Sequence, residues 1–360
     1  MTFGFTNRGT VESSDWSGAS KMKKLSLIIC LLLIGYSSAL AQEANFENKT
    51  IRIVVGFSSG GGFDAYARAI ARHLAKYLAG KPTIIVDNMP GAGSLIAANY
   101  TYNQAKPDGL TIGHFIGGVV VGQLLGNPAA QFNSQKFEWL GAPAKLDAVC
   151  ALTKTTGVDD LRTWMNAKTP VKLGATGPGS ETYDVPRVLQ AALGLPMQIV
   201  SGYKGTADIR LAAESGEIGG LCWGWEVMKA QWSKALDSGE ARVLIQALPK
   251  AEADLPKVPV AMELAKTEEA KKLIQIGIHD QSAILRPFAL PPGTPKGTVR
   301  VMQRAFQDSL KDSEFLAEMK QAKLGVDPVQ GTEIERIVAG MSKLDPGVAA
   351  KLRDILGIKK

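Results

Sequence analysis

The stretch "IRIVVGFSSGGGFDAYARAIARHL", residues 51–74, contains the pattern that decides the fold. The apolar run Ile51–Val55 predicts a buried strand, and the glycines Gly60–Gly62 predict a tight turn. Apolar residues at helical spacing predict a helix from about Asp64 to Leu78. A strand, a glycine turn and a helix N-terminus together form a common anion-binding arrangement. The stretch therefore predicts an α/β fold with a candidate anion site at this turn.

The same order of elements recurs along the chain. A first series continues with a strand at 82–88, a helix at 90–105 and a strand at 107–115. A second series has strands at 147–155, 171–176, 197–203, 219–225 and 241–248, with helices at 157–167, 177–194 and 204–218. Alternating strands and helices predict parallel sheets that are covered by helices on both faces. We therefore expect two α/β units in tandem.

The C-terminal region continues the pattern without a long linker. Residues 283–310 read as a strand, a proline-rich turn and a helix, and further helical sequence extends to Lys360. A tail of this length needs a surface to pack on, and we expect it to complete the first unit. The predicted domains are residues 45–148 together with 284–360, which makes the first domain discontinuous, and residues 149–283.

The N-terminal 41 residues have the features of a targeting segment. Lysines surround Met22, an apolar run extends from Leu25 to about Ile34, and "ALA" at 39–41 matches the small-x-small cleavage pattern. The apolar run is shorter than the roughly 20 residues that span a bilayer. We interpret residues 22–41 as a signal peptide, with Met22 as the expected start, and expect the protein in the periplasm.

Composition excludes several classes of function. The charged residues make up 21% of the chain, the formal net charge is +7, and the charges are interspersed without a Lys/Arg stripe. Nucleic acid is therefore not an expected partner. Beyond the signal peptide, only Cys150 and Cys222 remain. An exported protein permits a disulfide between them, but buried free thiols are the favoured interpretation.

The glycine turn does not match the nucleotide-binding motifs. A P-loop requires a lysine after its last glycine, and Gly62 is followed by Phe63. The dinucleotide fingerprint G-x-G-x-x-G needs a different spacing. Exposed backbone N–H groups and a helix N-terminus can hold a carboxylate equally well. We therefore predict no cofactor and a small anion as the ligand.

Two further turns are candidates for the same site. "ATGPGSETYD", residues 175–184, predicts a second strand–glycine–helix turn, in which Ser180 or Thr182 could bind a ligand or cap the helix. "SGYKGTADIR", residues 201–210, predicts a third. Trp223 and Trp225 are expected on one side of a strand, where they either line a cleft or fill the core. Such turns lie at the carboxyl ends of parallel strands, where α/β sheets bind ligands.

Catalytic motifs are absent from the sequence. The three histidines, His73, His114 and His279, form no metal-ligand pair at helical or turn spacing, and no G-x-S-x-G elbow occurs. His73 is expected at an exposed helix position. Asp64 is expected to organise the glycine loop rather than to act as a base. We therefore predict no catalytic residue and no metal site.

The ordered set of motifs resembles a known family. "GFSSGGGFDAYARAIARHL", "VDNMPGAGSLIAANY", "AKPDGLTIG", "GYKGTADIRLA", "LPKVPVAMEL" and "LPPGTPKGTV" follow one another as in the substrate-binding proteins of tripartite tricarboxylate transporters, the Bug receptors. The resemblance covers about residues 45–360. It implies a class II periplasmic binding protein with two α/β domains and a ligand cleft between them. It also implies a small carboxylate ligand and delivery to membrane permease subunits.

The resemblance also implies where the ligand binds. In the family, backbone amides and ordered water at the two glycine turns hold a carboxylate. With the third turn and the strand tryptophan, the predicted ligand-binding residues are Phe57, Ser58, Ser59, Gly60, Gly61, Gly62, Asp64, Thr176, Gly177, Gly179, Ser180, Tyr183, Tyr203, Lys204, Thr206 and Trp223. The family often has proline where Ser58 and Ser59 stand, and histidine in the region of Tyr183, so citrate is not assumed.

Three functions are compatible with this sequence. We favour a monomeric transport receptor. A cleft enzyme acting on a small carboxylate should show a nucleophile, base or metal cluster, and the sequence shows none. A sensor subunit that reports ligand occupancy to a membrane partner has the same sequence features as a transport receptor.

Overall fold

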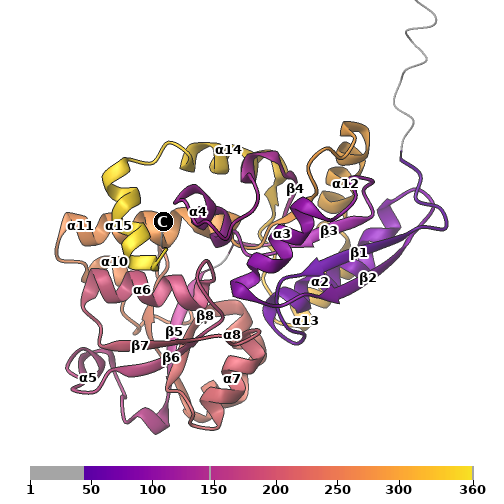
Figure 1. The fold of residues 1–360 in the computed structure, drawn as a ribbon. Coiled ribbons are helices and arrows are strands. Elements are labelled where there is room, and N and C mark those ends of the chain that lie inside the picture. The colour runs from indigo at the N-terminus through magenta and orange to yellow at the C-terminus, as the bar shows by residue number, and fades with distance from the viewer. Residues whose placement is uncertain (1–43, 146, 359–360) are drawn as a thin grey trace, which may run out of the picture. The chain divides into compact units, whose positions relative to one another are not determined.

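The computed structural model describes residues 44–145 and 147–358. The predicted signal peptide lies outside the described residues. The described part contains two β-sheets, each with helices packed against it (Figure 1). We call each sheet with its covering helices a lobe. Of the helices in the part that the structure describes, none is long and apolar enough to cross a membrane.

The first sheet has six strands in the order β11-β4-β10-β3-β1-β2. The pairs β1–β2 and β1–β3 are parallel, as the strand–helix alternation predicts. β10 lies between β3 and β4 and is antiparallel to both. The strand bounds are β1 Thr50–Val55, β2 Thr83–Asn88, β3 Thr111–His114, β4 Glu138–Ala142, β10 Phe288–Leu290 and β11 Val329–Gln330.

The second sheet has five strands in the order β7-β6-β8-β5-β9. β6 pairs in parallel with β7 and β8, whereas β5 is antiparallel to β8 and β9. Each sheet therefore contains one inserted antiparallel strand, β10 or β5. The strand bounds are β5 Ala148–Thr153, β6 Val171–Ala175, β7 Met197–Ser201, β8 Gly220–Gly224 and β9 Ala241–Gln246.

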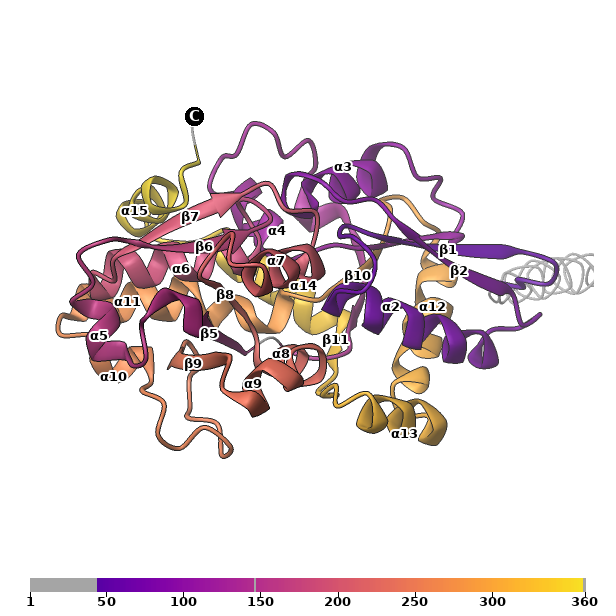
Figure 2. The same ribbon diagram turned by 90° about the horizontal axis from the view of Figure 1, so that it is seen from below.

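The chain passes between the lobes three times, and the last passage lies between α14 of the first lobe and α15, which packs against α6 of the second. The chain leaves the first sheet after β4 and enters the second at β5. It returns through a 3₁₀ segment, His279–Ile284, into β10. Figure 2 shows β5 to β9 of the second sheet on one side of the ribbon and β1 and β2 of the first sheet on the other. The two inserted strands therefore stand at the first two of these passages.

The helices of the first lobe follow from their apolar periodicity. α2, Gly62–Leu74, buries Tyr66, Ile70 and Leu74 and has Asp64 in its first turn, where a negative charge complements the helix dipole. Burying each large apolar side chain contributes about 1.5–3 kcal/mol. The remaining helices with the first sheet are α3 Leu95–Asn103, α4 Gly118–Leu124, α12 Lys296–Ser309, α13 Ser313–Gln321 and α14 Gly331–Met341.

The second lobe has its own set of helices. They are α5 Leu161–Met165, α6 Glu181–Leu193, α7 Thr206–Glu214, α8 Trp225–Gln231, α9 Ser233–Ser238, α10 Ala261–Leu264 and α11 Glu268–Gly277. The last helix, α15 Pro346–Leu356, packs against α6, whereas the sequence placed it with the first unit. The domain boundaries stay a prediction.

Three local expectations from the sequence are wrong. Cys150 and Cys222 form a disulfide between the neighbouring strands β5 and β8, so they are not free thiols. His73 is buried rather than exposed, because α13 covers this face of α2. Trp225 begins α8 after the strand has ended at Gly224, so the two tryptophans do not share a strand face.

Candidate ligand site between two glycine turns

The first glycine turn connects β1 to α2. Asp64 holds it in place: its carboxylate accepts hydrogen bonds from the Gly60 N–H at 2.9 Å and from Asn88 Nδ2 at 3.0 Å. Arg68 Nε donates to the same carboxylate at 2.9 Å. Gly60 has φ of +83°, a conformation that glycine adopts without steric cost. Asp64 therefore organises the loop, as the sequence predicts.

The second glycine turn connects β6 to α6 in a similar way. The Gly179 N–H donates to Asp184 Oδ1 at 3.0 Å, and Gly179 has φ of +89°. Ser180 occupies the N-cap position, but its hydroxyl donates to the Gly177 carbonyl at 2.6 Å instead of capping α6. Thr182 Oγ1 accepts from the Thr176 N–H at 3.1 Å. Hydroxyl groups therefore brace this turn from inside.

The two turns face one cavity. It is lined by backbone and side chains from both lobes, namely Phe57, Gly61, Gly62, Phe63, Ile116, Thr176, Ser180, Glu181, Thr182, Thr206, Trp223 and Arg286. Gly62 and Glu181 are the first residues of α2 and α6. The first four N–H groups of a helix have no partner inside it, and they form a partial positive charge. The cavity is therefore bordered by two helix N-termini.

The lobes are closed over this cavity. Its volume is about 10 Å³, room for about one water molecule. The Ser58 N–H donates to the Lys204 carbonyl at 3.0 Å, and the Ser58 hydroxyl donates to Asp208 at 2.6 Å. A Cβ built on Gly118 would approach the Gly179 carbonyl to 2.0 Å, so α4 lies directly against the second turn. Backbone contacts from both turns thus join the lobes.

Arg286 is a buried cation at the wall of the cavity. Its side chain is 1% exposed, its Nη1 donates to Glu226 at 3.2 Å, and its guanidinium lies 4.7 Å from the centre of the Tyr66 ring. Burial alone would lower the pKa of Arg286, but Tyr66, Glu226 and Glu181 raise it. Arg286 follows the return crossing, Glu226 lies on α8 and Tyr66 on α2, so this cluster also connects the lobes.

Glu181 supplies a carboxyl group to the same cavity. The residue is 4% exposed, and burial raises its pKa to about 7. Nearby Glu226 adds to the rise, while Arg286 and the Gly224 amide oppose it. Among the described residues, Glu181 Oε2 has no hydrogen-bond partner. The cavity therefore contains both a cationic and an acidic side chain.

The predicted site residues fall into four groups. Those that line the cavity are Phe57, Gly61, Gly62, Thr176, Ser180, Thr206 and Trp223. Those that contact the opposite lobe are Ser58, Lys204, Gly177 and Gly179. Gly60 and Asp64 shape the first loop. Ser59 is exposed, Tyr183 binds Arg187 and Tyr203 binds Glu217. Ligand contact stays a prediction for all of them.

Sequence reasoning missed four residues of the cavity, and Thr182, which it named as a possible ligand or cap residue, was left out of the predicted set. The four are Phe63, Ile116, Glu181 and Arg286. The signal for Glu181 was its place directly after Ser180, at the start of a helix that follows a glycine turn. The signal for Arg286 was a charged residue in the apolar run "AILRPFAL". Nothing local in that run indicates that it enters the site, because the pairing of β10 is non-local.

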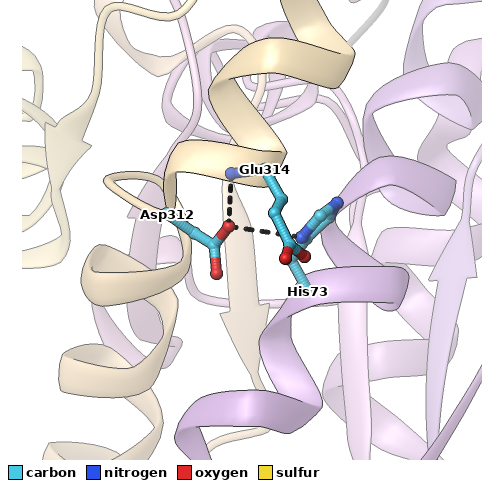
Figure 3. Close-up of side chains that lie close together, drawn as sticks. All are labelled: His73, Asp312 and Glu314. Carbon is cyan, nitrogen blue, oxygen red and sulfur yellow. Dashed lines mark hydrogen bonds and ion pairs between the residues drawn. The ribbon is translucent and has the colours of Figure 1, made fainter.

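A second cluster of ionisable groups lies away from the cavity. Figure 3 shows His73 on α2 close to Asp312 and Glu314 at the start of α13. Lys76 Nζ reaches the same three residues, at 3.0 Å from His73, 3.2 Å from Asp312 and 2.5 Å from Glu314. The Phe315 amide is the main cause of the lowered pKa of Asp312. A cation is already part of this cluster, so we interpret it as an ion-pair network that joins α13 to α2.

The comparisons with known proteins agree with this arrangement. The chain is 26% identical over 332 residues to a protein of Cupriavidus necator, "UPF0065 protein in gbd 5'region", covering 87% of this chain and 90% of that one. The structure of the periplasmic binding protein BugD matches with a TM-score of 0.70 at 21% identity, covering 86% of this chain and 98% of that one. MatC of Rhodopseudomonas palustris, solved with bound malate, matches with a TM-score of 0.67 at 20% identity, covering 85% and 98%.

These matches establish the two-lobed periplasmic binding protein fold. A model of the family described as "Tripartite tricarboxylate transporter family receptor" matches residues 66–344, which is more than half of the chain. Its members are substrate-binding receptors rather than enzymes, and a signal peptide and a periplasmic location are typical of them. The chain belongs to the tripartite tricarboxylate transporter receptor family.

Proposed function

We propose that this protein is a periplasmic receptor that captures a small carboxylated metabolite between its two glycine turns and delivers it, as a monomer, to a tripartite tricarboxylate-type permease. The observation that carries the proposal is the position of two helix N-termini, at Gly62 and Glu181, on one cavity. Backbone N–H groups at such ends stabilise a carboxylate by hydrogen bonding and by the helix dipole. MatC, of the same fold, was solved with malate.

Ligand entry requires the lobes to separate. The cavity of the closed form is about 10 Å³, too small for a dicarboxylate. The Ser58 contacts to Lys204 and Asp208 close the entrance and would break on opening. A ligand that touches both turns favours the closed state by its differential affinity for it. We propose that closure over the carboxylate is the signal that the permease reads.

A thermal-shift screen tests the binding proposal. Dicarboxylates, tricarboxylates, amino acids and aromatic acids are compared with neutral sugars. A true ligand at 100 times its dissociation constant stabilises the folded state by about 2.7 kcal/mol. At least one acid should raise the melting temperature. Stabilisation by sugars alone would show that the carboxylate proposal is wrong.

The variant Gly62→Val tests the first turn directly. A Cβ at Gly62 lies 3.0 Å from both methyl groups of Val227 on α8, so the larger side chain opposes closure. We expect loss of ligand binding with the fold retained in circular dichroism. Gly297→Val is the matched control, because a Cβ there meets nothing within 4 Å. Binding of unchanged affinity by Gly62→Val would remove this turn from the site.

Delivery to a permease needs a separate measurement. Uptake of the radiolabelled ligand is compared in cells that carry the permease subunits with and without the receptor. We expect uptake to require the receptor and to fail with Gly62→Val. Receptor-independent uptake, with binding intact in the purified protein, would favour a sensing role over transport.

A further inference from the structure

The cavity holds two buried groups of opposite charge that are not joined by an ion pair. Arg286 and Glu181 both line it, and they form no ion pair within 4.0 Å of each other in the described part of the chain. Arg286 is paired with Glu226 instead, so among the described residues Glu181 has no cation at ion-pair distance. Burying an unpaired carboxylate is unfavourable unless a ligand or a proton compensates it.

Each of the two groups retains an unused hydrogen-bonding atom. Among the described residues, Glu181 Oε2 has no donor and Arg286 Nε has no acceptor, although both atoms are buried. Buried polar atoms are satisfied in nearly all native structures, by protein groups or by ordered water, and a ligand that takes the place of such water has to bond to both atoms. Because Glu181 Oε2 is an acceptor and Arg286 Nε is a donor, a ligand that satisfies both needs a donor group and an acceptor group.

A simple carboxylate satisfies only part of this site. The N–H groups of the helix N-termini and of Arg286 Nε can donate hydrogen bonds to its oxygens. Glu181 would then face a second negative charge or have to hold a proton. An ammonium group on the ligand resolves the conflict, because it donates to Glu181 Oε2 and neutralises its charge. Hydrogen bonds between charged groups are also the strong ones in proteins.

We propose that the ligand is an amino carboxylate, a molecule with both an ammonium and a carboxylate group, and that Glu181 is the specificity-determining residue that accepts its ammonium. This inference rests on the proposed receptor function and narrows its substrate class. In this arrangement the carboxylate binds between the first turn of α2 and Arg286, and the ammonium lies at the first residue of α6.

Matched ligand series test the inference by isothermal titration calorimetry. Aspartate, malate and succinate differ only in an amino group, a hydroxyl group or hydrogen at one carbon, and glutamate, 2-hydroxyglutarate and glutarate form a longer series. The other common α-amino acids are each paired with the corresponding 2-hydroxy acid. We expect an amino ligand to bind at least about tenfold more tightly than its hydroxy partner, as a charge-assisted bond of about 1.5–3 kcal/mol implies.

The variant Glu181→Gln tests the residue. It keeps the size and an acceptor oxygen but removes the charge, so we expect the preference for the amino ligand to shrink to less than about threefold. Glu263→Gln is the control: Glu263 is an exposed glutamate on α10, outside the cavity, and the preference should be retained. A preference that survives Glu181→Gln would overturn the inference.

Proton linkage gives a readout that does not depend on a variant. The charged groups facing Glu181 are Arg286 and Glu226, and burial raises its pKa to about 7, so part of the ligand-free protein holds a proton there at pH 6.5. An ammonium expels that proton, whereas a simple carboxylate recruits one. Titrations in two buffers of different ionisation enthalpy should therefore show proton release with the amino ligand and none with Glu181→Gln.

The outcomes separate this inference from the proposed function. If acids bind but the amino member of each series is equal to or weaker than its partner, the receptor proposal stands and the amino carboxylate inference fails. Proton uptake with the best ligand would overturn it as well. If no acid in the panel binds, the carboxylate receptor proposal and the inference fall together.

Discussion

The two glycine turns are built alike but balance their charges differently. In each, an aspartate in the first turn of a helix accepts a hydrogen bond from a loop amide, at 2.9 Å for Asp64 and 3.0 Å for Asp184. Asp64 also binds Arg68 and Asn88, and although burial alone would raise its pKa, these hydrogen bonds lower it. Burial raises the pKa of Asp184 to about 7. The same backbone geometry is thus supported by a charged group in one lobe and by a partly protonated one in the other.

The difference extends to what each turn presents to the cavity. The first turn contributes backbone and aromatic groups, from Phe57 to Phe63, and its acid points into its own loop. The second turn contributes Glu181 and depends on Arg286, which follows the return crossing, for nearby positive charge. We infer that the first turn supplies general affinity for a carboxylate. The second turn supplies discrimination among carboxylates.

The largest expected effect comes from removing the cation that serves the second turn. Arg286→Met removes the positive charge beside the partly exposed Glu226 and the buried Glu181, and removing one partner of a buried ion pair costs up to about 3–5 kcal/mol. We expect a loss of this size in the free energy of unfolding, measured by urea denaturation without ligand at pH 7.

The first turn provides the matched control for this prediction. Arg68 bonds to Asp64, but its side chain is 45% exposed, and exposed ion pairs contribute about 0–1 kcal/mol. Arg68→Met should therefore destabilise the protein far less than Arg286→Met. Equal losses from the two variants would mean that the turns do not differ in the way described.

An effect of intermediate size is expected from the two aspartates, with opposite dependence on pH. The folded pKa of Asp184 is raised from 3.8 to about 7, so its contribution to stability is present below about pH 4 and is lost as the pH rises toward 7. Asp184→Asn removes this loss. As the pH is raised from 5 to 8, the free energy of unfolding of Asp184→Asn should therefore increase by about 2–3 kcal/mol relative to that of the wild type.

Asp64→Asn should behave in the other direction. The folded pKa of Asp64 is lowered below 3.8, so its contribution is present above that pH and is lost only as the pH falls further. The variant should be destabilised by about 1–3 kcal/mol, by the same amount throughout pH 5–8. Chemical denaturation at several pH values measures both variants. Parallel curves for the two aspartates would contradict the comparison.

The smallest effect, a change in ligand affinity, is expected at the contact between the two lobes. Ser58→Ala removes the 2.6 Å hydrogen bond to Asp208 but leaves the main-chain bond to Lys204. A single such bond contributes about 1 kcal/mol, so ligand affinity should fall about fivefold through a less stable closed state. Ser59→Ala, at the exposed neighbouring position, should bind like the wild type. A similar change in both would exclude a specific role for Ser58.

The sequence predicted the elements whose signals are local. α2 and β1 were predicted because apolar periodicity and a glycine turn lie within 24 residues of each other, and the loop role of Asp64 followed from its place at the helix start. The sequence allowed a disulfide between Cys150 and Cys222, but free thiols were favoured, and that interpretation is wrong. The disulfide depends on the antiparallel pairing of β5 with β8, which no stretch of sequence specifies by itself.

The candidate site was predicted in its backbone and not in its charges. Strand ends and helix starts indicated where the two glycine turns lie, and both turns line one cavity, while ligand contact at them stays a prediction. Arg286 was missed because it reaches the cavity only through the insertion of β10 between β3 and β4. This insertion pairs Phe288 with His114, and the two residues are 174 positions apart in the sequence. Glu181 was quoted in the second turn but read as part of a helix start rather than as a cavity group.

The insertion of β10 also has a consequence for how the chain folds. The strands on either side of it, β3 and β4, are synthesised long before Phe288–Leu290, so the first sheet stays divided until nearly the whole second lobe has emerged. Contacts this far apart in sequence form slowly. The two halves of the first sheet can therefore be joined only after β5 to β9 of the second sheet have been synthesised.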